Sequence, residues 1–194
     1  MFREQMDRRR DTFDAVNDAA RGKDIAEVIK KRLTAFEVVL PPDAKYLAIG
    51  AGQAQAEMEF ARALGVAEPR ITLLDKKFSS KAVTRFTDTA FSGQQIEEDI
   101  FRFLDTPAHD KFDVVSAIGM EYVFDTQEGI EKLAAGLSTR MNPEGVALLL
   151  PSSFSGDATS TWNNYGFTSL GPNSNGTPRY YTMLFRTPVV KGLE

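Results

Sequence analysis

Short apolar segments alternate with helical patterns through the middle of the sequence, and this alternation constrains the fold more than any other feature. Four such segments are Tyr46–Ile49, Ile71–Leu74, Phe112–Ile118 and Val146–Leu150, and Gln95–Glu98 is a weaker fifth. The stretches between them carry apolar residues at helical spacing. Strands that are apolar on both faces and alternate with helices form a parallel sheet with helices on both sides. We therefore expect an α/β fold of three layers.

The two ends of the chain depart from this pattern. At the start, apolar residues at helical spacing predict two helices, over residues 2–20 and 25–36, with a stop and restart at Arg21–Asp24. Near the end, residues 165–170 and 180–185 are strand-like, and the turn-rich stretch between them predicts an antiparallel hairpin. We expect a helical segment over residues 1–40, either a lid or an interaction arm, and one domain over residues 41–194.

The composition excludes several classes of function. The chain has 194 residues, no cysteine and a single histidine, so thiolate metal sites, a cysteine nucleophile and a multi-histidine metal site are excluded. We predict no metal. The 23 basic and 27 acidic residues give a net charge of −4, which does not favour a nucleic-acid-binding surface. No apolar run approaches the ~18 residues of a membrane span, and no signal peptide is recognisable, so we expect a cytoplasmic protein.

A glycine-rich turn follows the first predicted strand. Gly50-Ala51-Gly52 ends that strand and opens a helical stretch. Glycines there permit a tight turn and let a ligand approach the backbone, and the helix N-terminus offers unpaired amides. The dinucleotide-binding pattern G-x-G-x-x-G is incomplete, because Gln55 occupies the position of its third glycine.

An acidic residue ends the second predicted strand. Asp75 lies at the edge where open α/β sheets bind ligands, and a carboxylate there can accept hydrogen bonds from both hydroxyls of a ribose. The alternative is a structural acid that caps the next helix or pairs with Lys76 or Lys77. Because the glycine turn precedes it at the right distance, we favour a nucleoside site.

These segments together resemble class I S-adenosylmethionine-dependent methyltransferases over approximately residues 45–188. The matching segments are Leu47–Ala54 as the first motif, Leu73–Asp75 as the second, Glu98–Ile100 as the adenine segment, Phe112–Gly119 as the fourth strand and Met141–Gly145 as the loop before the fifth. The resemblance implies a Rossmann-like fold with a mostly parallel seven-stranded sheet that ends in an antiparallel hairpin. It also implies S-adenosyl-L-methionine as the cofactor.

The resemblance assigns roles to single residues. The implied cofactor site comprises Gly50, Ala51, Gly52, Asp75, Lys76, Asp99, Ile100 and Ile118. Within it, the glycines would approach the methionine part and Asp75 the ribose. Asp99 would accept from the adenine amino group with Ile100 beside the ring, and Asp99 is also suited to cap the next helix. Two departures stand out, since family members usually have an acid at the position of Ala48 and often a glycine at that of Ala54.

Candidates for the acceptor side follow the fourth and fifth predicted strands. Glu121 and Tyr122 lie where the transferred methyl group would emerge, and a carboxylate or phenol there can orient or deprotonate a nucleophile. The alternative is a surface acid and a packing aromatic. Trp162 either lines the acceptor pocket or packs in the core.

The sequence thus favours methyl transfer from S-adenosylmethionine to an unidentified acceptor, a small molecule rather than a nucleic acid. Two alternatives stay open. One is a non-catalytic module of the same fold that binds a nucleoside or a protein, which Ala48 favours. The other is an NAD-dependent oxidoreductase, which the missing third glycine and the predicted hairpin oppose. The sequence predicts no oligomeric state.

Overall fold

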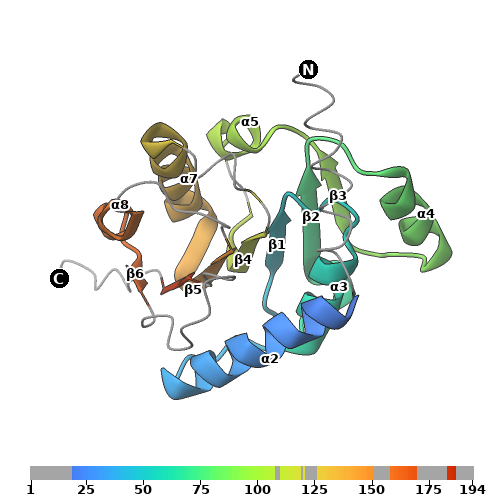
Figure 1. Cartoon of the computed structure of the whole chain (residues 1–194), viewed down its shortest axis with the longest axis horizontal. Coiled ribbons are helices and arrows are strands. Elements are labelled where there is room, and N and C mark those ends of the chain that lie inside the picture. Colours follow the sequence, from blue (N-terminus) through green and yellow to red (C-terminus); the bar gives the residue numbers. More distant parts are fainter. Residues whose placement is uncertain are drawn as a thin grey trace.

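A computed structural model describes residues 19–107, 110–118, 120, 126–150, 158–169 and 183–186 of the chain (Figure 1). Its helices are α2 (Ala19–Ala35), α3 (Gln55–Leu64), η1 (Glu68–Arg70), α4 (Ser80–Asp88), α5 (Ile100–Asp105), α7 (Gln127–Arg140) and α8 (Ala158–Asn164). Its strands are β1 (Tyr46–Ile49), β2 (Ile71–Asp75), β3 (Gln94–Glu97), β4 (Phe112–Ile118), β5 (Met141–Leu150), β6 (Thr168–Ser169) and β7 (Met183–Arg186).

The strands form one sheet in the order β3-β2-β1-β4-β5-β7-β6. The five strands β1 to β5 are parallel, which confirms the predicted α/β fold with a parallel sheet. The chain first runs outward from β1 through β2 to β3, then returns to the other side of β1 with β4. The order therefore reverses between β1 and β4, and open α/β sheets bind their ligands beside such a switch point, at the carboxyl ends of the strands.

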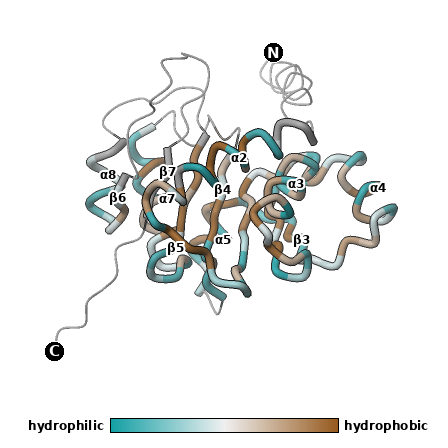
Figure 2. The backbone as a smooth tube through the Cα atoms, turned by 90° about the horizontal axis from the view of Figure 1, so that it is seen from below, coloured by the Kyte–Doolittle hydropathy of each residue, from teal (hydrophilic) through white to brown (hydrophobic). Residues whose placement is uncertain are grey.

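Helices cover both faces of the sheet, and β1 shows why. Tyr46 and Ala48 point into a core shared with α2, α3 and α4. Leu47 and Ile49 point the opposite way, into a core shared with α5, α7 and α8. Every residue of β1 is buried, because successive side chains of a strand alternate between two covered faces. The central strands β4 and β5 are likewise coloured as hydrophobic in Figure 2.

The N-terminal helix differs from the prediction. α2 runs without interruption from Ala19 to Ala35, through the predicted stop at Arg21–Asp24. Gly22 is buried against α3, and a β-carbon there would lie 2.3 Å from the carbonyl oxygen of Ala56. The glycine permits close helix packing instead of ending a helix. Most of the predicted first helix lies outside the described residues, and the division at residue 40 stays a prediction.

The first of the two C-terminal strands begins later than predicted. Residues 165–167 continue the turn that ends α8, since the backbone N–H groups of Tyr165 and Phe167 both donate to the carbonyl of Trp162. β6 therefore has only two residues and pairs antiparallel with β7, which pairs antiparallel with β5. The sheet thus has five parallel strands, and over the described residues its antiparallel edge consists of the short strands β6 and β7.

Trp162 itself is fully buried in the core beside α7, with its ring perpendicular to that of Phe167 at 5.1 Å between centroids. It packs in the core, as the alternative interpretation held. Among the helices that the structure describes, none has both the length and the apolar character needed to cross a membrane.

Candidate functional site

The turn after β1 is fixed to the neighbouring strand by its own backbone. The N–H groups of Gly50 and Ala51 both donate to the carbonyl of Leu74, at 2.9 and 3.1 Å. Gly50 and Gly52 have φ angles of 70° and 52°, a left-handed conformation that glycine adopts without steric cost. The turn therefore lies pressed against the end of β2, where Asp75 follows Leu74.

Asp75 binds this turn directly. Its Oδ2 accepts a hydrogen bond from the N–H of Gly52 at 2.8 Å, and its Oδ1 accepts one from the N–H of Lys77 at 2.9 Å. An ionised carboxylate has about four acceptor positions, so both oxygens can still accept from a ligand. The helix-cap alternative fails, because Ser79 caps α4 by accepting from the N–H of Ala82.

Five of the predicted cofactor residues border one small cavity at the carboxyl edge of the sheet. They are Gly50, Asp75, Lys76, Asp99 and Ile100. The cavity has a volume of about 30 Å³. Ala51 and Gly52 do not border it; Ala51 is fully buried. Ile118 ends β4 at the same edge of the sheet. Glu121 and Tyr122 lie outside the described residues.

Asp99 caps a helix in this structure. Its Oδ1 accepts from the N–H of Phe101 at 3.0 Å and, more weakly, from that of Arg102 at 3.5 Å. This leaves Oδ2 available beside the cavity, so a cap and a ligand contact are compatible. Ile100 is only 6% exposed and supplies an apolar wall.

Met120 also borders the cavity, although the sequence analysis did not select it. Its side chain is 3% exposed and lies over Gly50, so that a β-carbon on Gly50 would be 2.3 Å from the Met120 sulfur. The one signal in the sequence is that Met120 comes two positions after the end of β4, immediately before the predicted acceptor-side residues Glu121 and Tyr122.

A buried acid lies in the first turn of α3, the helix that follows the glycine turn. Glu57 is 2% exposed, and its Oε2 has no hydrogen-bond partner among the described residues. Burial raises its pKa to about 8, a hydrogen bond from its own N–H opposes the rise, the charge of Asp75 adds to it, and Arg85 opposes it. Glu57 is therefore largely protonated at neutral pH. Its helical spacing with the apolar residues Ala54, Met58 and Ala61 was a signal of this burial.

Glu57 belongs to a polar group inside the core. The hydroxyl groups of Tyr46 and Ser116 lie 2.5 Å apart. Burial raises the pKa of Tyr46, and the charge of Glu57 raises it further. Ser116 is the register partner of Ala48 on β1. A carboxyl group from α3 thus lies near the strand position where the resembled family usually carries an acid.

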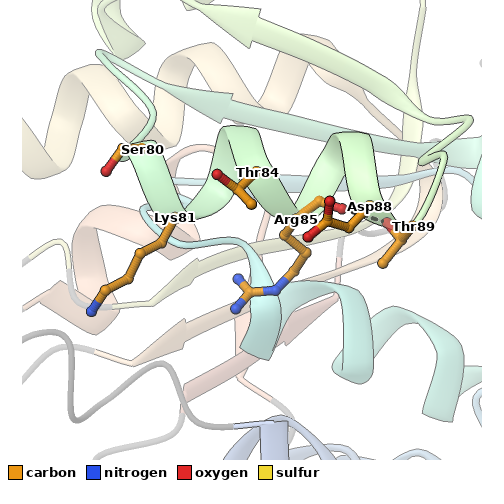
Figure 3. A pocket seen from close by; sticks show the side chains of 6 residues that line it. All are labelled: Ser80, Lys81, Thr84, Arg85, Asp88 and Thr89. Atoms are coloured by element: carbon orange, nitrogen blue, oxygen red, sulfur yellow. Dashed lines mark hydrogen bonds between the residues drawn. The ribbon is translucent and has the colours of Figure 1, made fainter.

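A larger hollow, of about 460 Å³, runs along the exposed face of α4 (Figure 3). Lys81 and Arg85 extend from the same side of this helix. Arg85 donates to the carbonyl of Gln53 and, at 2.7 Å, to Oε1 of Gln55. The hollow is open to solvent and is lined by α4 and the residue that follows it, whereas small-molecule sites are concave clefts that bury most of the ligand. Arg85 therefore has a structural role here, since its two hydrogen bonds hold the segment between the glycine turn and α3.

Comparison with known proteins identifies the fold. No protein-family model matches the sequence, and no curated protein is significantly similar to it. Solved structures do match. A TehB-like SAM-dependent methyltransferase from Corynebacterium glutamicum is 17% identical with a TM-score of 0.62, covering 95% of this chain and 97% of that one. A SAM-dependent methyltransferase from Clostridium acetobutylicum is 12% identical with a TM-score of 0.66, covering 84% and 90%.

A third match contains a ligand. The magnesium protoporphyrin IX methyltransferase from Synechocystis PCC 6803, solved with bound SAM, is 13% identical with a TM-score of 0.60, covering 86% of this chain and 79% of that one. At such low identities the comparisons establish the fold and not the activity. The chain has the Rossmann-like fold of class I methyltransferases, as the sequence motifs implied.

Proposed function

We propose that this chain binds S-adenosyl-L-methionine at the carboxyl edge of β1, β2 and β3 and transfers its methyl group to a small acceptor. The observation that carries the proposal is the Gly52–Asp75 hydrogen bond, which joins the glycine turn to the acid after β2 at the switch point of the sheet. The fold supports it, because several proteins of the same fold are SAM-dependent methyltransferases.

The residues at this edge have the chemistry that such a cofactor needs. Asp75 keeps acceptor positions for ribose hydroxyls, and Asp99 keeps Oδ2 for an amino group. Ile100 offers an apolar surface to a flat ring. The volume does not yet fit, since a cavity of about 30 Å³ is far smaller than a nucleoside site. Binding therefore requires a side chain to move.

The cofactor would supply an activated methyl group on a sulfonium centre. In the transfer, sulfur would keep the electron pair of its bond to the methyl carbon, the acceptor would supply the pair for the new bond, and the acceptor's proton would pass to a base or to solvent. The protein then has to hold the two partners in line and exclude water. Glu121 and Tyr122, which follow β4 in the sequence, remain our candidates for orienting the acceptor.

A non-catalytic module of the same fold is the second candidate. Ala48 favours it, since it replaces an acid that the resembled methyltransferases usually carry. In that case the chain binds a nucleoside or a protein and transfers nothing.

Calorimetric titration with S-adenosylmethionine, S-adenosylhomocysteine and NAD tests these functions. We expect saturable binding of the first two and none of NAD. Incubation with methyl-labelled cofactor and a panel of small phenols, amines and carboxylic acids then tests transfer. Binding without transfer to any acceptor class would favour the non-catalytic module, and binding of NAD alone would favour an oxidoreductase.

A further inference from the structure

The cavity at the carboxyl edge of the sheet is almost closed in this structure. The cavity of about 30 Å³ has room for a water molecule or two, whereas pockets for small molecules measure roughly 300–1,000 Å³. Met120 borders it and is almost completely buried. Its neighbours around the cavity, Lys76 and Asp99, are exposed. Met120 thus belongs to the apolar inner wall of the cavity, together with Ile49, Leu74 and Ile100, while Lys76 and Asp99 lie at its polar rim.

The Met120 side chain occupies the space that Gly50 leaves by having no side chain. A β-carbon at Gly50 would lie 2.3 Å from the Met120 sulfur and 3.0 Å from its Cγ. A ligand that approaches the backbone of the glycine turn needs the same space. Met120 therefore lies in the space over Gly50 that a bound ligand would have to occupy.

Methionine is well suited to leave such a position. Its unbranched side chain has three rotatable bonds and a polarizable thioether, so it adapts to several packings at small cost. Its contact group in the cavity is also a thioether, which is the group that S-adenosylhomocysteine carries between its nucleoside and its amino acid. A ligand of this class can replace the sulfur contact that Met120 gives up.

We propose that Met120 is a plug that fills the ligand space over Gly50 in the free protein and is displaced when ligand binds. This inference rests on the proposed function, since it concerns the same cavity. The plug sets affinity, because apparent affinity falls in proportion to the fraction of molecules in which the pocket is open.

Truncation of the plug tests the proposal by calorimetry. We expect Met120→Ala to bind S-adenosylhomocysteine at least about tenfold more tightly than wild type. This gain follows if the closed state outweighs the open state by that factor in the free wild-type protein. Any other ligand that needs the space over Gly50 should gain by the same factor, because the same closed state is removed for each. Met141→Ala is the matched control, because Met141 is equally buried in the same core but begins β5, at the opposite end of the sheet. It should leave the affinity unchanged.

A measurement on the wild-type protein guards against a variant that does not fold. With methionine methyl groups labelled by carbon-13, the signal of Met120, assigned by its loss in Met120→Leu, should shift more than that of Met141 when S-adenosylhomocysteine is added. A ligand that binds while the Met120 signal stays in place overturns the plug. A folded Met120→Ala protein that binds no more tightly than wild type also overturns the plug.

The proposed function fails separately from the plug. If Met120→Ala binds S-adenosylhomocysteine and wild type does not, the plug is supported and cofactor binding by the natural chain is refuted. If wild type binds and the variant gains nothing, the function stands and the plug is refuted. If neither folded protein binds, both are refuted.

Discussion

The Asp75 carboxylate accepts a hydrogen bond from the backbone N–H of Gly52 at 2.8 Å and thereby joins the end of β2 to the turn after β1. Its other oxygen accepts from the N–H of Lys77 at 2.9 Å. The acid that is proposed to hold a ribose therefore also holds the backbone that the ligand approaches. Any substitution at Asp75 changes both the ligand contacts and the shape of the turn.

Asp75→Ala should lower both stability and affinity. Two backbone N–H groups lose a charged acceptor, and such losses cost about 1–3 kcal/mol of unfolding free energy. The affinity for S-adenosylhomocysteine should fall at least tenfold, because its ribose loses the same acceptor. Urea denaturation measures the first effect and calorimetry the second.

Asp75→Asn separates the two roles, because an amide keeps one acceptor oxygen but places an N–H₂ group where the second oxygen was. It should retain more stability than Asp75→Ala and still bind weakly. Asp88→Ala is the matched control, since Asp88 is an exposed acid in the hollow along α4. Wild-type affinity in both Asp75 variants would exclude this residue from the ligand site.

Glu57 should make the protein less stable as pH rises through neutrality. Its pKa is about 8 in the folded chain against an ordinary value of 4.5, so the folded state holds an extra proton between these values. The unfolding free energy should then fall with rising pH over this window, by at most about 1.4 kcal/mol per pH unit, and level off above it. Glu57→Gln should remove this component, which urea denaturation at a series of pH values detects.

Other acids titrate over part of the same range, so the difference between wild type and variant is the quantity of interest. Glu59→Gln controls for the loss of an acid on α3, since Glu59 pairs with Lys23 and Arg62 near the surface. Its difference curve should show no decline between pH 4.5 and 8. A Glu57→Gln curve parallel to that of wild type would show that Glu57 is ionised in the folded protein.

The apolar strand pattern alone predicts the parallel sheet and which residues end its strands. Strands buried on both faces are apolar throughout, as Tyr46–Ile49 is, and this pattern needs no knowledge of distant contacts. Once the sheet is parallel, the residues that end its strands must meet at one edge. Gly52 and Asp75 could therefore be placed at the same edge of the sheet before their hydrogen bond was seen.

The remaining features depend on tertiary packing, which the local pattern does not contain. Gly22 resembles a helix end, because glycine is a poor helix former, yet its role is a close contact with α3. Met120 could have faced solvent after β4. Its position over Gly50 is a tertiary contact, which no spacing rule gives.

Gly22→Ala should destabilise the protein even though alanine is the better helix former. The added β-carbon would lie 2.3 Å from the backbone oxygen of Ala56, so α2 and α3 must move apart. We expect a loss of about 1–3 kcal/mol, the usual cost of overpacking, against a propensity gain of about 1 kcal/mol. Asp24→Ala, at an exposed position of the same helix, should cost little. A Gly22→Ala variant with raised thermal stability would contradict this packing of α2.

Asp99 offers the sharpest separation of a structural role from a ligand role. Its Oδ1 caps α5, and its Oδ2 is the atom assigned to the adenine amino group. Asp99→Ser keeps a capping oxygen and removes the second one, whereas Asp99→Ala removes both. The alanine variant should therefore lose about 1 kcal/mol of stability and the serine variant much less, while both should bind S-adenosylhomocysteine more weakly.

A ligand variant makes the test specific to the amino group. S-inosylhomocysteine has a carbonyl oxygen where the adenine amino group would be, and that oxygen is repelled by a carboxylate. Wild type should prefer the adenine ligand over the inosine ligand, and Asp99→Ser should lose most of this preference, as measured by the ratio of the two dissociation constants. An unchanged ratio in a stable Asp99→Ser protein would leave Asp99 as a helix cap and place the adenine elsewhere along the edge of the sheet.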